Sequence, residues 1–272
     1  MNFPKMDRKK IQRIIEVVLL AAALILGGSA INDYYQAYKQ TQLNEELRQQ
    51  IEEQVDLLAR QEPAEEQVSA PANIFLLEPL RAVNQETVAW LDVDGTKIQY
   101  PVVQTADNDY YLRYTFQRER SILGAIFMDF RNNPMLQDFN TVIYGHTNRG
   151  SEEMFGSMKL LRDQDYWQDN HTVTVMLDDR YYKYEIFSVY ATEADFDYRT
   201  PNYRRPEDAE RFLREIQERS EIKSDVVPTP DDKILTLSTC TFEFNDARLA
   251  LHAVLVEERD AENKLVMYND RK

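Results

Sequence analysis

Short strand-like segments recur along most of this chain, and they constrain its fold more than any other feature. From about residue 74 onward, runs of aliphatic, β-branched and aromatic residues are separated by turn residues. Residues 87–103, TVAWLDVDGTKIQYPVV, predict two strands joined at Asp94-Gly95, a pair that tolerates the positive φ angles of a tight turn. Further strand candidates are residues 122–128, 140–145, 172–177, 180–191, 233–239 and 248–257. About eight strands can close into a small barrel without free edges, so a mainly β domain is predicted for residues 74–260.

One helix, residues 206–219, is predicted to interrupt these strands, in the segment PEDAERFLREIQERS that begins at Pro206. Pro206 suits the first helical position, and the acidic residues after it favour the N-terminal end of the helix dipole. Apolar side chains then recur at helical spacing, at Ala209, Phe212, Leu213 and Ile216. We therefore expect one long inserted helix with one face buried against the barrel.

The first 31 residues have the pattern of a single-pass membrane anchor. Residues 1–13 carry a local charge of +4, and residues 14–31, IIEVVLLAAALILGGSAI, are almost entirely apolar. Basic residues on the N-terminal side predict that the N-terminus lies in the cytoplasm and that the rest of the chain is extracellular. A cleaved secretory signal is the alternative, because GSA before Ile31 resembles a cleavage site. Either interpretation places the bulk of the chain outside the cytoplasm.

The remaining segments are predicted to be accessory to the β domain. Residues 32–73 combine apolar residues at helical spacing with a Pro- and Ala-containing stretch, which predicts a helical stalk and a linker. Residues 261–272 are predicted to form a C-terminal tail. The net charge of −15 argues against a nucleic-acid partner, because binding nucleic acid needs a basic face.

Cys240, in KILTLSTC, is the single cysteine of the chain and therefore forms no internal disulfide. Strand alternation places it on the same face as Ser238, at the end of a strand, whereas a cysteine with a packing role more often lies among aliphatic residues. Arg248 opens the next strand, and pairing of the two strands would bring its guanidinium beside the sulfur. A permanent cation there would stabilise a thiolate or an oxyanion formed when sulfur attacks a carbonyl. An inert thiol and a solvated arginine are the alternative interpretation.

Three histidines are candidates for a general acid or base. His146 follows a strand-like run in NTVIYGHTNRG, a position from which catalytic side chains often project. His171 precedes a strand and has the context of an exposed loop residue. His252 lies within the strand LALHAVL and is expected to have a structural role.

The chain resembles the class B sortases, cysteine transpeptidases of Gram-positive cell surfaces. The resemblance covers roughly residues 75–258 and rests on several separated motifs. These motifs are WLDVDGTKIQYPVVQTADNDYYL, GAIFMDFRN, NTVIYGHTNRGSEEMF, the inserted helix, and TLSTC followed by an arginine on the next strand. It implies an eight-stranded sortase-type barrel with N-terminal helices, a membrane-anchor helix before them, and a Cys–His–Arg site.

By this resemblance Cys240 is the nucleophile, His146 the general acid and base, and Arg248 the group that stabilises the oxyanion. The same resemblance implies that Ser238, Thr239, Tyr198 and Asn108 line the substrate groove. In some members a carboxylate follows the cysteine closely, and the nearest one here, Glu243, is assigned no role.

The resemblance implies cleavage of a C-terminal sorting motif of the NPQTN or (S/N)PxTG type at its Thr carbonyl, followed by transfer to a peptidoglycan amine. The expected partners are therefore exported proteins with a sorting signal and a peptidoglycan precursor or cross-bridge amine. Pilin polymerisation on a lysine acceptor, hydrolysis of the sorting motif, an L,D-transpeptidase-like wall enzyme and a binding module without catalysis remain alternatives. No cofactor or metal is expected, since CxxC, HExxH and Gly-rich phosphate motifs are absent from the sequence.

Overall fold

The computed structural model describes residues 77–147, 151–241, 243, 246–260 and 265–269, together with scattered positions between 27 and 49. The strands are β1 (Thr87–Val93), β2 (Gln99–Val103), β3 (Ile126–Met128), β4 (Asn140–Tyr144), β5 (Thr172–Met176), β6 (Arg180–Glu193), β7 (Ile234–Cys240), β8 (Ala247–Asp260) and β9 (Leu265–Tyr268). The helices are α2 (Leu77–Val83), the 3₁₀ helices η1 (Tyr110–Leu112) and η2 (Gly156–Arg162), α3 (Gln164–Asp169) and α4 (Pro206–Glu218).

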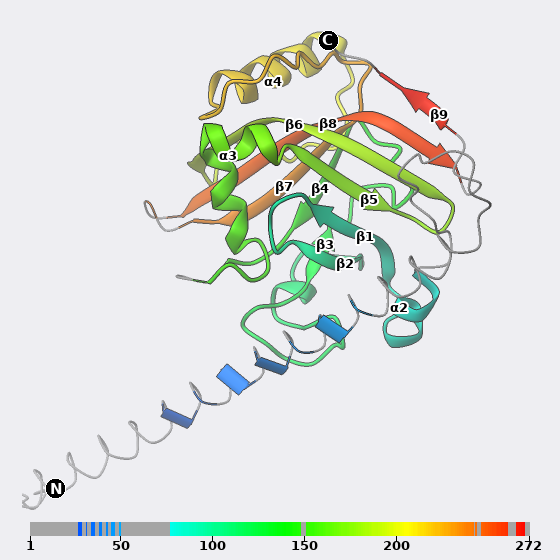
Figure 1. Cartoon of the computed structure of the whole chain (residues 1–272), viewed down its shortest axis with the longest axis vertical. Helices are drawn as coiled ribbons and strands as arrows, with labels where there is room; N and C mark the ends of the chain where they lie inside the picture. Colours follow the sequence, from blue (N-terminus) through cyan, green and yellow to red (C-terminus); the bar gives the residue numbers. More distant parts are fainter. Residues whose placement is uncertain are drawn as a thin grey trace, which may run out of the picture.

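Eight of these strands form a closed ring, as the sequence predicts. Their order is β6-β5-β1-β2-β3-β4-β7-β8, and pairing of β8 with β6 closes the ring (Figure 1). Most neighbours are antiparallel, but β2–β3 and β4–β7 are parallel. Closure leaves none of these eight strands with an unpaired edge.

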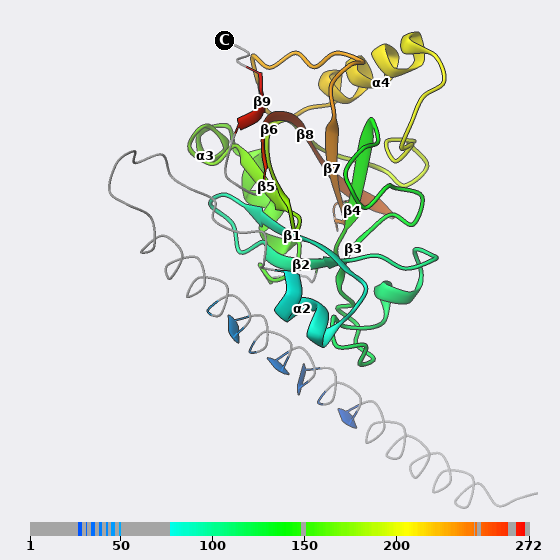
Figure 2. The same cartoon turned by 90° about the vertical axis from the view of Figure 1, so that its right-hand side faces the viewer.

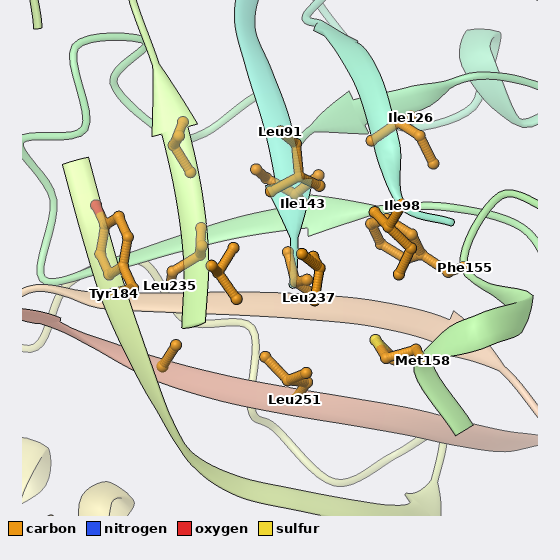
Figure 3. Packing of buried hydrophobic residues seen from close by; sticks show 14 of the residues in the cluster. Leu91, Ile98, Ile126, Ile143, Phe155, Met158, Tyr184, Leu235, Leu237 and Leu251 are labelled. Atoms are coloured by element: carbon orange, nitrogen blue, oxygen red, sulfur yellow. The ribbon is translucent and has the colours of Figure 1, made fainter. Parts of the chain in front are cut away.

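The interior of the ring is filled by alternate side chains from every strand. Leu91, Ile143, Leu235, Leu237 and Leu251 meet there, and each is fully buried (Figure 3). Phe155 and Met158, which lie before and within η2, enter the same cluster and cover one end of the ring. Because the apolar set of β7 is Leu235 and Leu237, the opposite set, which includes Cys240, faces outward.

Two helices cover the outside of the barrel at opposite ends (Figure 2). α4 buries Ala209, Phe212, Leu213 and Ile216, as its spacing predicts, and it contributes to a cluster on the outer face of β6, β7 and β8. Fully burying an aliphatic or phenyl side chain of this size contributes roughly 1.5–3 kcal/mol. α2 packs through Leu77 and Leu80 on Trp90 of β1 and Phe127 of β3.

Two details differ from the sequence-based predictions. The predicted strand at 122–128 begins only at Ile126, because Gly124 has φ +58° and the N–H of Ala125 donates to the carbonyl of Tyr111. The predicted tail contains a ninth strand, β9, which pairs with β8. Its four residues are largely exposed, so they carry no burial alternation that would have marked a strand.

The predicted anchor at 14–31 and the linker lie almost entirely outside the described residues. The positions that are described between Gly27 and Gln49 are helical. Within the described part of the chain, no helix is long and apolar enough to cross a membrane.

Candidate active site

Three neighbouring strands bring the three candidate catalytic residues to one edge of the barrel. Cys240 is the last residue of β7, and it pairs with Arg248 on the antiparallel strand β8. On its other side β7 runs parallel to β4, with Tyr144 opposite Ser238. The N–H of Gly145 donates to the carbonyl of Ser238 at 3.2 Å. If the β4–β7 register continued for two residues beyond Tyr144 and Ser238, His146 would lie beside Cys240. Since adjacent strands lie about 4.7–4.9 Å apart, this continuation would give the order His146, Cys240, Arg248.

Cys240 is exposed and projects from the outer face of the barrel. The other residues of this face of β7 are polar or lie under α4, whereas the inner face is aliphatic. An exposed thiol at a strand end, next to a cation, has the accessibility that a nucleophile needs and that a packing cysteine lacks. The structure therefore favours the nucleophile over the inert thiol.

The ring of His146 is held by the connection between β2 and β3. Its Nε2 lies 2.9 Å from the carbonyl oxygen of Leu112, the last residue of η1. Because a carbonyl oxygen only accepts hydrogen bonds, Nε2 carries the hydrogen in this arrangement. Among the described residues, Nδ1 has no hydrogen-bond partner. Gly124 leaves room for the ring, since a Cβ atom there would lie 3.1 Å from His146 Cδ2.

The guanidinium of Arg248 lies along the start of its own strand. Its Nη1 donates to the carbonyls of Asp246 and Ala247, at 3.1 and 3.2 Å. Among the described residues these are its hydrogen-bond partners, so Nε–H and Nη2–H are available to bind an oxyanion. Burial raises the pKa of the Tyr198 phenol, and the hydrogen bond with Ser238 and the charges of Arg199 and Arg248 oppose that rise.

The predicted groove residues of β7 and of the segment before α4 form a buried support under the cysteine. Ser238 and Thr239 are almost fully buried, and Tyr198 is fully buried. The hydroxyl of Tyr198 lies 2.8 Å from that of Ser238. Thr239 Oγ1 has no hydrogen-bond partner among the described residues. Direct contact between these three side chains and a substrate stays a prediction.

Asn108 belongs to a polar cluster on the other side of His146, centred on the buried carboxylate of Asp129. Asn108 Nδ2 donates to this carboxylate at 3.1 Å, Tyr144 Oη donates at 2.9 Å, and Arg131 binds it through Nε and Nη2. Burial alone would raise the pKa of Asp129, but the hydrogen bonds from Arg131 and Tyr144 outweigh burial and hold it below its usual range. Asp129 thus orients both Asn108 and Tyr144.

Several residues of the site were not identified from the sequence. Tyr144, the last residue of β4, is two residues before His146, so the YGH motif contains the signal that would have found it. The Leu112 carbonyl carries no side-chain signal. Asp129 lies within the quoted GAIFMDFRN motif, but its partners are distant in sequence.

The other two histidines have structural environments. His252 is fully buried between the hydroxyls of Tyr190 and Thr236, at 2.9 and 2.8 Å, as expected for a structural histidine. His171 Nδ1 donates to the carbonyl of Gln168 in a loop. In the described residues no group of three or more His, Cys, Asp or Glu side chains is arranged to hold a metal ion.

Comparison with known proteins identifies the family to which the chain belongs. A sortase domain matches residues 91–256. The chain is 35% identical over 182 residues to sortase B of Listeria monocytogenes, covering 66% of this chain and 74% of that protein. It is 30% identical over 243 residues to sortase B of Staphylococcus aureus, covering 89% and 94%. A solved S. aureus sortase B–substrate complex superposes with a TM-score of 0.70 at 29% identity, covering 80% of this chain and 97% of that one.

A closed β-barrel with an exposed cysteine between a histidine and an arginine defines a cysteine acyl-transfer enzyme. The chain belongs to the sortase family, and within that family to class B. It is therefore a cysteine transpeptidase of the cell-wall sortase type.

Proposed function

We propose that this enzyme cleaves a C-terminal sorting motif of the NPQTN or (S/N)PxTG type at its Thr carbonyl and transfers the acyl group to a peptidoglycan amine. Exported proteins are thereby anchored to the cell wall. The observation that supports the proposal is the strand register, in which the exposed Cys240 pairs with Arg248 and β4, the strand that ends two residues before His146, runs beside β7. A relative described in complex with its substrate, the S. aureus sortase B, supports recognition of a sorting peptide.

In the first half-reaction the Cys240 thiolate attacks the Thr carbonyl carbon, and the carbon–sulfur bond forms. The oxyanion receives hydrogen bonds from Nε and Nη2 of Arg248 and from a backbone N–H near the cysteine. His146 begins as imidazolium, with Nε2–H bound to the Leu112 carbonyl, and donates its Nδ1 proton to the departing amine as the carbon–nitrogen bond breaks. A thioester on Cys240 and a neutral imidazole remain.

In the second half-reaction an acceptor amine attacks the thioester. Neutral His146 takes the proton of the amine at Nδ1, the new amide bond forms, and the carbon–sulfur bond breaks. Cys240 leaves as a thiolate, so the imidazolium–thiolate pair of the starting state is restored. Water in place of the amine would give hydrolysis of the motif.

A panel of sorting-motif pentapeptides, with mass spectrometry of the acyl-enzyme, tests this proposal. Wild-type enzyme is expected to gain the mass of the acyl fragment ending in Thr, and Cys240→Ala and His146→Ala are expected to lose turnover. His171→Ala serves as the matched control, because its ring contacts the carbonyl of Gln168 in α3. Cleavage by Cys240→Ala at the wild-type rate would refute the mechanism.

The acceptor is tested with the same peptides, with and without an added amine. A peptidoglycan cross-bridge amine is expected to accelerate release of the acyl group and to appear in the product. Release as the free acid only would indicate a sorting-motif hydrolase. Preference for a pilin lysine would indicate pilus assembly.

The cellular location follows from the first 31 residues. Residues 1–13 are basic and 14–31 apolar, so we infer a single-pass anchor with the catalytic domain on the extracellular face of the cell membrane. Full-length protein is expected in the membrane fraction and accessible to protease added outside protoplasts. Recovery in the soluble fraction at full length would contradict the anchor.

A further inference from the structure

The connection between β7 and β8 joins the nucleophile to the arginine, and it contacts the rest of the enzyme through Glu243. This connection runs from Thr241 to Asp246, directly after Cys240 and directly before the strand that carries Arg248. The N–H of Thr241 donates to the carbonyl of Ala247, which closes the connection on itself. Among its described residues, Glu243 is the one whose side chain binds another element.

The partner of Glu243 is Arg162, the last residue of η2. Arg162 binds Glu243 through Nη1 to Oε1 and through Nη2 to Oε2, the second at 3.2 Å. It also binds Glu221 through Nε at 2.7 Å and Nη2 at 2.9 Å. A planar guanidinium with five donors can hold two carboxylates in a fixed geometry, which the single ammonium of a lysine cannot.

Glu221 and η2 are both part of the rigid frame of the barrel. Glu221 follows α4, its N–H donates to the carbonyl of Val189 on β6, and its Oε1 accepts from the N–H of Ala191 at 3.1 Å. η2 is connected to His146 through Phe155, whose N–H donates to the His146 carbonyl at 2.9 Å and whose ring lies in the core. Arg162 is therefore fixed to the same frame as His146.

We propose that Arg162 is a positioning residue that acts through Glu243, holding the Cys240–Arg248 connection in a fixed position relative to His146. This role rests on the proposed function of the site. Arg162 bridges the part of the enzyme that carries the acid and base to the part that carries the nucleophile and the oxyanion donor. Glu243, the carboxylate that follows the cysteine, is a ligand of Arg162 and not a partner of the catalytic histidine.

The alternative is an ordinary surface ion pair without an effect on chemistry. The side chains of Arg162 and Glu243 are 26% and 39% exposed, and pairs with that exposure contribute little to stability, about 0.2–1 kcal/mol. Displacement of a reacting group by about 1 Å can nevertheless reduce a rate by up to 10²-fold. Turnover, rather than the melting temperature, separates the two possibilities.

The test compares Glu243→Gln, Arg162→Lys and their double variant with wild type. Gln cannot form the ion pair, and Lys keeps the charge but cannot hold both carboxylates. For Glu243→Gln we expect a fall in kcat of about tenfold, with KM and the melting temperature nearly unchanged. The double variant is expected to lose no more than the worse single variant, because both changes break the same contact.

Glu258→Gln is the matched control, since Glu258 forms a partly exposed pair with Arg180 across β6 and β8, at 2.9 Å. It is expected to keep the wild-type kcat. A second readout is the rate at which a thiosulfonate labels Cys240, which needs no sorting peptide and is expected to change in Glu243→Gln but not in Glu258→Gln.

Wild-type kcat in Glu243→Gln, or independent additive losses in the double variant, would overturn the positioning role. A wild-type enzyme that cleaves none of the sorting peptides, with labelling that still depends on Glu243, would instead refute the proposed function and leave the positioning role intact.

Discussion

Two histidines on neighbouring parts of this barrel differ in role because their surroundings differ. His146 lies at a strand end, with one ring nitrogen on the Leu112 carbonyl. His252 lies inside the cluster under α4, with both ring nitrogens occupied by the hydroxyls of Tyr190 and Thr236. Burial lowers the pKa of His252 to about 3, so this ring is neutral in the folded protein over the range in which enzymes of this kind work. The two histidines are therefore distinguished by their partners. Both ring nitrogens of His252 are occupied, whereas among the described residues His146 has a hydrogen bond at Nε2 alone.

The buried His252 predicts an acid-dependent loss of stability. Its pKa is about 3 in the folded state and about 6.5 in the unfolded chain, so the unfolded state binds more protons between these values. The contribution of His252 to the free energy of unfolding is fully present above pH 6.5 and is lost as pH falls toward 3. Between pH 7 and pH 5 this loss amounts to about 2 kcal/mol. Urea unfolding of wild type and His252→Gln at both pH values measures it.

His252→Gln is expected to be less stable than wild type at pH 7 by about 1–3 kcal/mol, because the two hydroxyls lose their ring partner. Its stability is expected to fall less between pH 7 and pH 5 than that of wild type. His171→Gln, a change in a loop, is expected to keep the wild-type acid dependence. Equal acid dependence in wild type and His252→Gln would contradict the prediction.

Arg248→Lys tests whether charge alone is enough at the oxyanion position. Lysine keeps the positive charge but loses the planar arrangement of Nε–H and Nη2–H that the structure leaves available. We expect kcat for a sorting peptide to fall by about 10²-fold, with a small change in KM. Steady-state kinetics with Arg180→Lys as the control measures it, and wild-type turnover would show that the cation is sufficient.

At the scale of elements, the site depends on three strands and on the connection that supports one of them. β4, β7 and β8 set the order of the catalytic residues, and the segment from η1 to β3 holds the His146 ring. Gly124 in this segment has φ +58°, and a Cβ atom there would lie 2.2 Å from the Tyr111 carbonyl oxygen. A side chain at this position requires movement of the backbone that supports the ring.

Gly124→Ala is therefore expected to lower kcat by at least about tenfold, beyond its cost in stability. Gly95→Ala is a matched control, because Gly95 also has a positive φ, +69°, and its Cβ would meet Asn170, in a turn away from His146. We expect Gly95→Ala to lose stability but to keep its kcat per folded molecule. Circular dichroism melting together with peptide kinetics measures both effects, and equal kcat values in the two variants would count against the support role of Gly124.

The cluster around Asp129 predicts an effect on substrate recognition. Asp129→Asn removes the charge that Arg131, Tyr144 and Asn108 share, so Asn108 and Tyr144 lose their fixed orientation. We expect KM for a sorting peptide to rise several-fold and stability to fall by about 1–3 kcal/mol, with a smaller change in kcat. Asp178→Asn, in an ion pair with Arg81, serves as the control. An unchanged KM would show that the orientation of Asn108 and Tyr144 does not contribute to substrate binding.

The sequence predicts those parts of the fold that depend on local pattern. The hairpin at Asp94-Gly95, the helix at Pro206 and the pairing of β7 with β8 all follow from turn residues, spacing and short separation. The parallel pairing of β4 with β7, which brings His146 to Cys240, joins residues 94 positions apart and leaves no local signature. The contact of Arg162 with Glu243, 81 positions apart, likewise has no local sequence pattern. The same holds for the hydrogen bond between the His146 ring and the backbone carbonyl of Leu112.

At the scale of the whole molecule, the closed ring and the site lie within residues 77–260. One described contact between the N-terminal part and the barrel is an exposed ion pair of Lys39 with Glu119, at 2.8 Å, and such pairs contribute about 0.2–1 kcal/mol. A chain that begins at residue 74 is therefore expected to fold and to cleave sorting peptides with the wild-type kcat. Thermal unfolding and peptide kinetics of the shortened and full-length proteins measure this, and loss of folding would show that the N-terminal segment is part of the core.

Cys240 is the only sulfhydryl of the chain, and it is open to solvent at the mouth of the reaction centre. An electrophile shaped like the scissile peptide therefore meets no second thiol on the same protein. The amount of such a reagent that binds covalently would measure the fraction of active molecules in a preparation, and an oxidant that modifies this one sulfur atom would inactivate the enzyme.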